Sequence, residues 1–113
     1  MTATDVRNQL MLDLFITALE GGIGYWAKAS EYDPEAVDFY ATVYDVEDDE
    51  WFRIDAKIIA KGYRLATSEW RNRIAWSTDK PPVVITEDTD WDFDAGDADV
   101  IVQLGLFGEV VYG

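Results

Sequence analysis

The sequence predicts one α+β domain over residues 1–113, with an N-terminal helix, a small antiparallel sheet, a basic amphipathic helix and a buried C-terminal segment. Two stretches repeat apolar residues at helical spacing, and the segment between them alternates apolar and polar residues as a strand does. Glycine, proline or clustered acids separate these segments. With 49% hydrophobic and 14% aromatic residues the chain can build one core, which argues against global disorder.

Residues 5–20 form the first expected helix. Apolar residues recur within it at steps of three to five positions: Val6, Leu10, Leu14 or Phe15, and Leu19. Thr4 is a suitable N-cap, and Asp5 in the first turn suits the helix dipole. Gly21-Gly22 should end the helix, because glycine takes the left-handed conformation without a Cβ clash.

An antiparallel sheet is expected next. Residues 24–32 alternate aromatic and polar side chains, and residues 37–46 alternate apolar and polar ones after the break at Pro34. The acid-rich stretch 45–50 is typical of a turn, and residues 51–54 fit a short return strand. These segments predict a hairpin closed by an acidic turn.

A basic amphipathic helix should run from Asp55, which can cap it, to about Trp70. Its apolar face comprises Ile58, Ile59, Leu65 and Ala66. Its basic face comprises Lys57, Lys61 and Arg64. Gly62 weakens this helix by about 1 kcal/mol relative to alanine.

The pattern leaves the remaining segments open. Residues 71–76 extend the basic helix or form a strand, and residues 83–86 fit a short strand after the boundary at Pro81-Pro82. Residues 98–112 are almost wholly apolar, and periodicity does not separate a buried helix from a strand there. The β-branched residues 100–102 favour a strand, whereas the acids just before them favour a helix N-terminus.

The net charge of −14 is spread unevenly along the chain. Residues 1–52 hold twelve acids and two bases, residues 53–80 hold three acids and seven bases, and residues 81–113 hold eight acids and no base. Part of this charge should be neutralised when the segments fold together. The remainder repels nucleic acid and anionic membranes, so we expect direct binding to neither. A protein with a basic nucleic-acid-binding surface is a suitable partner instead.

The chain contains no cysteine and no histidine. It therefore has no disulfide framework and no thiol chemistry, and it lacks the commonest general base and transition-metal ligand. No run reaches transmembrane length, and the first residues lack a basic region followed by an apolar stretch. We expect a cytoplasmic protein that is not an enzyme and uses no cofactor.

Three passages resemble a group of small, acidic, uncharacterised proteins of bacteriophages and prophages. They are residues 18–22 with Tyr25-Trp26, the Lys61-Gly62 pair, and residues 97–103 continuing to 106–109 and Tyr112-Gly113. In such proteins the C-terminal apolar passage looks like a helix, which implies a buried C-terminal helix at residues 96–107. The resemblance also implies a phage-encoded accessory protein in the cytoplasm of the bacterial host. It implies no activity and no catalytic residues.

Residues 87–99 form the densest acidic run, with seven carboxylates among thirteen residues. The aspartates at every second position from Asp88 match the first three ligand positions of an EF-hand calcium loop, and Asp99 falls at the twelfth. The sixth position, which needs glycine for a sharp turn, is Phe93. We therefore predict no specific metal site, and loose binding of divalent cations stays open.

Two smaller polar groups each have a functional and a structural explanation. Glu20 beside Gly21-Gly22 and Tyr25 could form a small carboxylate site, but an ordinary last-turn glutamate before a helix stop explains the same residues. The basic face of the second helix could bind phosphate, but packing near the acidic turn or the acidic run explains it too. We favour the structural explanation for both groups.

The acids of the turn and of the late run are candidates for contact with a partner protein. Duplex DNA carries one negative charge per roughly 1.7 Å of its axis, and surface carboxylates can imitate that pattern. Trp and Tyr among the acids fit this hypothesis because they are favoured interface anchors, and such binding should weaken with salt. The candidate contacts are Asp45, Glu47, Asp48, Asp49 and Glu50 in the turn, and Glu87, Asp88, Asp90, Trp91, Asp92 and Asp94 in the run. Alternatively, these residues are solvated loops that keep the protein soluble.

The leading interpretation is a non-enzymatic phage accessory protein that binds and inhibits a nucleic-acid-binding host protein of defence or restriction type. It would do so through an acidic surface that imitates nucleic acid. Two alternatives stay open: a small homo-oligomeric structural or assembly protein, and a carboxylate-dependent protein that binds a metal or a nucleotide.

Overall fold

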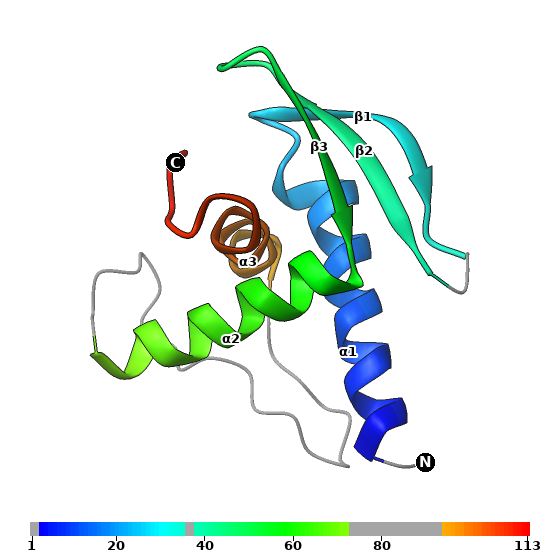
Figure 1. Ribbon diagram of the computed structural model, residues 1–113, viewed down its shortest axis with the longest axis vertical. Helices are drawn as coiled ribbons and strands as arrows, with labels where there is room; N and C mark the ends of the chain where they lie inside the picture. Colours follow the sequence, from blue (N-terminus) through cyan, green and yellow to red (C-terminus); the bar gives the residue numbers. More distant parts are fainter. Residues whose placement is uncertain (1–2, 36–37, 73–93) are drawn as a thin grey trace.

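The computed structural model describes residues 3–35, 38–72 and 94–113 (Figure 1). It confirms the α+β class, because helices accompany a three-stranded antiparallel sheet. In chain order the elements are α1 (Ala3–Thr17), the π-helical turn η1 (Ala18–Gly22), β1 (Ala27–Asp33), β2 (Tyr40–Asp45), β3 (Glu50–Asp55), α2 (Ala56–Asn72) and α3 (Ala95–Phe107). Of the segments left open above, residues 73–76 and 83–86 lie outside the described residues. None of the helices within these ranges is long and apolar enough to cross a membrane.

The sheet has the strand order β1-β2-β3, with both neighbouring pairs antiparallel. Ala41 and Val43 of β2 are buried and alternate with partly exposed residues, which confirms the period-two pattern expected there. β1 begins at Ala27, three residues later than the alternation predicts, and a bulge between Ala29 and Glu31 shifts its pairing with β2. β2 and β3 form the expected hairpin around the acidic turn.

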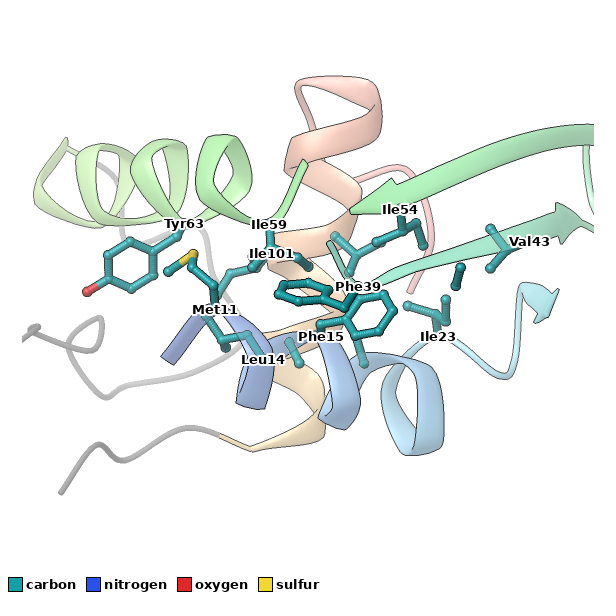
Figure 2. Close-up of a cluster of buried hydrophobic side chains, with 14 of the residues drawn as sticks. Met11, Leu14, Phe15, Ile23, Phe39, Val43, Ile54, Ile59, Tyr63 and Ile101 are labelled. Carbon is teal, nitrogen blue, oxygen red and sulfur yellow. The ribbon is translucent and has the colours of Figure 1, made fainter. Parts of the chain in front are cut away.

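The core lies between one face of the sheet and the helices (Figure 2). Phe15 of α1 packs on Phe39, which precedes β2, with the ring centroids 4.6 Å apart. Ile54 of β3 and Ile59 of α2 are fully buried in the same cluster, and Ile101 brings in α3. Burial of these side chains joins segments that are far apart in the sequence.

Aspartates start two of the helices: Asp55 caps α2 as predicted, and Asp94 caps α3, for which the sequence indicated only acids near a helix N-terminus. The Oδ1 of Asp55 accepts the N–H of Ile58 at 3.1 Å. Asp94 caps α3 in a reciprocal pair: its Oδ1 accepts the N–H of Asp97 at 2.9 Å, and the Oδ2 of Asp97 accepts the N–H of Asp94 at 3.0 Å. The N-cap predicted for α1 was wrong, since Thr4 lies inside that helix, which the structure describes from Ala3 onward.

α1 ends in the widened turn η1, where the N–H of Ile23 donates to the oxygen of Ala18 at 3.0 Å. Gly22 ends this turn as predicted, but the predicted reason was wrong, because it has no positive φ. A Cβ on Gly22 would lie 2.7 Å from the backbone oxygen of Ala95 at the start of α3. Glycine is required there by the close approach of α3.

Two further glycines allow the backbones of α2 and α3 to come into direct contact. A Cβ on Gly62 would overlap the backbone oxygen of Ile101 and lie 2.8 Å from its carbonyl carbon. A Cβ on Gly105 would overlap the backbone oxygen of Ile58 and lie 2.8 Å from its Cγ2. Gly62 therefore lowers helix propensity but permits the crossing.

α3 confirms the buried C-terminal helix, and the strand favoured by residues 100–102 does not form. Gly108 ends the helix in the left-handed conformation with φ of 77°, and its N–H donates to the oxygen of Leu104 at 2.9 Å. The remaining residues, 108–113, leave the helix as a short tail (red in Figure 1). We call this segment the tail.

Candidate partner-binding surface and a buried polar network

The acidic turn between β2 and β3 contains one buried carboxylate. Asp45 is 0% exposed, and its Oδ1 accepts the N–H groups of Glu47 at 2.9 Å and Asp48 at 3.2 Å. Its Oδ2 accepts the hydroxyl of Tyr112 at 2.7 Å. Asp45 therefore shapes the turn from inside, which corrects the expectation that it belongs to the exposed acidic surface.

The rest of the turn presents its acids to solvent. The exposed acids are Glu47, Asp48, Asp49 and Glu50. Trp51 follows them at 60% exposure, with its ring centroid 5.2 Å from that of Tyr44. The Tyr44 hydroxyl donates to Asp49, and this hydrogen bond raises the pKa of Tyr44. Four predicted contacts and one exposed aromatic side chain thus gather at the end of the hairpin remote from α2 (Figure 1).

The late acidic run is described only from Asp94 onward. Asp94 is exposed, but it belongs to the capping pair of α3, where its charge lies at the positive end of the helix dipole. It belongs to a different element from the turn. The other predicted contacts of this run lie outside the described residues: Glu87, Asp88, Asp90, Trp91 and Asp92.

The basic face of α2 remains exposed. Lys57 and Lys61 point to solvent, and neither forms an ion pair with a residue that the structure describes. On β3, Arg53 pairs with Asp55 at 3.7 Å and lies 4.4 Å from the ring centroid of Tyr40. No ion pair therefore joins these two lysines to the acidic turn, and most of the acidic run, the other expected neighbour of the basic face, lies outside the described residues.

A second buried carboxylate, Asp99 of α3, lies at the centre of a polar network. It is 7% exposed and accepts the hydroxyl of Tyr25 at 2.5 Å, the indole Nε1–H of Trp26 at 2.9 Å and the Nε2–H of Gln103 at 2.9 Å. Burial, together with the Asp99 carboxylate, raises the pKa of Tyr25 to about 12, so its hydroxyl stays a donor at neutral pH. The three donors replace the water that Asp99 loses on burial.

Gln103 extends the network to the tail. This side chain is fully buried, and its Oε1 accepts the N–H groups of Val111 at 2.8 Å and Tyr112 at 2.7 Å. Its Nε2 donates to the backbone oxygen of Tyr112 at 3.1 Å. One amide side chain thus pairs with the tail backbone much as a neighbouring strand would.

Tyr112 carries the tail into contact with the sheet. Its ring stacks on Trp26 with the centroids 5.1 Å apart, and Phe107 meets it edge-on at 6.1 Å. Its hydroxyl donates to Asp45 at 2.7 Å and to Asp48 at 3.1 Å, and these hydrogen bonds help to raise the pKa of Tyr112. The tail therefore links α3 to the base of the acidic turn.

Sequence reasoning missed this network, although one signal for it is present. Asp99 and Gln103 are four positions apart within an almost wholly apolar segment, so in a helix they share one face. Two polar side chains on one face of a buried helix each need hydrogen-bond partners, and at this spacing they can supply one to each other. The passages that carry the phage resemblance supply the other members, Tyr25-Trp26 and Tyr112.

The smaller candidate sites do not assemble. Glu20 accepts the hydroxyl of Tyr32 at 2.7 Å, whereas Tyr25 turns to Asp99, so the suggested site of Glu20 and Tyr25 is not formed. Among the residues that the structure describes, no group of three or more acidic side chains is placed to hold a metal ion. Comparisons of the chain with protein-family models, with curated proteins and with solved structures give no match.

Proposed function

We propose that this chain is a non-enzymatic accessory protein of phage type that binds and inhibits a host protein with a basic nucleic-acid-binding surface. The target class is a defence or restriction protein. The observation that carries the proposal is the hairpin end, where residues 47–50 expose four consecutive carboxylates directly before Trp51, itself 60% exposed.

The physical argument is electrostatic imitation combined with an aromatic anchor. A row of closely spaced negative charges is attracted to a groove built for phosphates, and it displaces the same counterions. A large exposed indole ring can enter an apolar recess and bury area that charge alone does not provide. The net charge of −14 adds long-range attraction to a basic partner and repulsion from nucleic acid itself.

The turn is also held in a defined shape. Asp45 fixes the first amides of the turn from inside, and Asp49 is held in the left-handed conformation with φ of 57° while it accepts the Tyr44 hydroxyl. A preordered set of charges loses less conformational entropy on binding than a flexible acidic loop. The resemblance to phage proteins adds the context of a host target.

The test is capture of a partner from bacterial lysate by the immobilised full chain at low and high salt. We expect a basic nucleic-acid-binding protein to be retained at low salt and released at high salt, because exposed charge pairs are screened. Retention that ignores salt, or the absence of any basic partner, would refute the proposal.

A matched pair of variants assigns the contact to the turn. Glu47→Gln with Glu50→Gln removes two charges whose side chains make no hydrogen bond to any residue that the structure describes, and Glu35→Gln with Asp38→Asn removes two before the other end of β2. At about 0.5–1 kcal/mol for each exposed charge, the turn variant should bind the partner roughly 5- to 30-fold more weakly. Equal binding by the two variants would place the contact elsewhere.

A further inference from the structure

The tail is attached to the domain like a bound peptide. Its docking site, here called the tail site, consists of Trp26, Asp45, Asp48, Gln103 and Phe107. The site binds both the backbone and the side chain of Tyr112. The buried Gln103 amide forms hydrogen bonds with the Tyr112 backbone at 2.7–3.1 Å, and the carboxylates of Asp45 and Asp48 accept the Tyr112 hydroxyl. These are the recognition elements of a peptide-binding site.

Between Gly108 and Tyr112 the contact with the rest of the domain that the structure describes is made by the backbone, where the N–H of Val111 donates to Gln103 at 2.8 Å. Gly108, where the tail begins, has φ of 77°, and residues 109–111 are exposed. Tyr112 is therefore the anchor, joined to α3 by a short linker that includes a glycine. Such a linker can adopt a second path by rotation about a few backbone bonds.

Exposed apolar side chains surround the same region. Four of the six large hydrophobic residues found exposed within the described parts of the chain belong to the tail or contact the tail site: Val110 and Val111 are in the tail, the Tyr25 hydroxyl lies 3.4 Å from the Nε2 of Gln103, and the N–H of Val46 donates to the oxygen of Trp26 at 3.0 Å. They are Tyr25 (54% exposed), Val46 (42%), Val110 (46%) and Val111 (48%). Clustered apolar exposure is typical of a surface that meets another protein.

We propose that the tail site binds the tail of a second copy of this chain, and that two copies exchange tails reciprocally. Every contact of Tyr112 is then made between copies instead of within one, so the contacts themselves favour neither form. The exposed residues Tyr25, Val110 and Val111 lie at the junction and add apolar burial that only the dimer gains. Because Tyr112 lies four residues after Gly108, a span of at most roughly 14 Å, the two tail sites must face each other closely.

Salt should change tail exchange and partner binding in opposite directions. Two copies that each carry −14 repel each other, and Asp48 of the acidic turn lies at the tail site itself. Added salt screens this repulsion, so exchange should increase with ionic strength. Binding of a basic partner should decrease under the same conditions, which lets the two proposals fail separately.

Complementation between two full-length variants tests the exchange. Gln103→Ala damages the site but keeps the anchor, whereas Tyr112→Ala removes the anchor but keeps the site. In an isotope-labelled mixture at high protein concentration and high salt, native mass spectrometry should show a heterodimer more than about ten-fold above the statistical ratio, because only it pairs an intact anchor with an intact site. A statistical ratio, or no dimer at all, would overturn the proposal.

A peptide experiment keeps the test decisive should Gln103→Ala fold poorly. The probe is a labelled peptide with the sequence of residues 108–113, and the readout is fluorescence anisotropy. Full-length Tyr112→Ala should bind it saturably and at least about ten-fold more tightly than the unaltered chain, whose site is occupied. A control peptide with alanine in place of tyrosine should not bind. Absence of binding, or equal binding by both proteins, refutes the tail site as a site for a second copy.

Discussion

Substitution of Gly62 by alanine tests the crossing of α2 and α3, on which the position of the network depends. The Cβ would lie 2.8 Å from the carbonyl carbon of Ile101 and 3.1 Å from the backbone nitrogen of Gly105. Carbon atoms in contact need about 3.5 Å, so the helices must separate by at least roughly 0.7 Å. The neighbours are backbone atoms of a helix, which have no rotamer with which to move aside.

The net cost follows from two opposing terms. Overpacking by one methyl group costs about 1–3 kcal/mol, and the rigid backbone neighbours place Gly62 at the upper end. The higher helix propensity of alanine stabilises the fold by at most about 1 kcal/mol, which offsets part of this cost. We therefore expect Gly62→Ala to lower the free energy of unfolding by about 2 kcal/mol or more. For a domain of this size, that loss corresponds to a melting temperature roughly 8 °C lower.

The control is Gly21→Ala, whose Cβ would meet only the Cβ of Ala95 at 3.8 Å, an ordinary contact. It should leave stability unchanged or raise it by up to about 1 kcal/mol. Urea denaturation followed by circular dichroism measures both variants. The loss from Gly62→Ala combined with Gly105→Ala should be smaller than the sum of the single losses, because one separation of the helices relieves both clashes. If Gly62→Ala is as stable as Gly21→Ala, the helices do not cross as described.

Three further predictions concern the polar network and the tail. Asp99→Ala leaves three donors without their acceptor and should destabilise the fold by about 2–4 kcal/mol. Asp99→Asn keeps one acceptor oxygen and should destabilise it less. The midpoints of urea denaturation of the two variants test this difference. The pKa of Tyr25 is raised from 10.0 to about 12, so the folded chain retains a proton that the unfolded chain has lost. The free energy of unfolding should therefore fall as pH rises from 10 to 12, and Tyr25→Phe should flatten that slope in urea titrations at several pH values. Tyr112→Phe removes the donor to the buried Asp45, so amide hydrogen exchange in the acidic turn should accelerate, and unchanged exchange would contradict the role of the tail in bracing it.

The elements of this fold could be predicted because each depends on its local sequence. The alternation in β2 depends on which side chains face the core, and the start of α2 depends on Asp55 within the same segment. The C-terminal helix was different, since residues 100–102 have strand propensity, and only the preceding acids and the resemblance pointed to a helix. There, burial against α2 and the Asp94 cap outweigh a preference of a few tenths of a kcal/mol per residue.

The candidate site was less predictable because the sequence shows where carboxylates are but not which way they face. Asp45 and Glu47 are two positions apart in one acidic stretch, yet the first is fully buried and the second is exposed. Asp45 continues the buried face of β2 after Ala41 and Val43. The donor that its carboxylate needs there is Tyr112, which lies 67 positions away. A contact between residues so far apart leaves no local pattern, and the same holds for the bond from Trp26 to Asp99.

The tail makes the two proposals depend on each other. Asp45 uses one carboxylate oxygen to fix the amides of the turn and the other to hold Tyr112, so release of the tail removes a donor from a fully buried acid. A copy whose tail is displaced keeps all of its negative charges but loses the brace that orders them. In a dimer formed by exchange, the tail of the second copy restores that brace to both turns. If partner recognition requires ordered charges rather than charge alone, Tyr112→Ala should weaken partner binding even though it changes no charge.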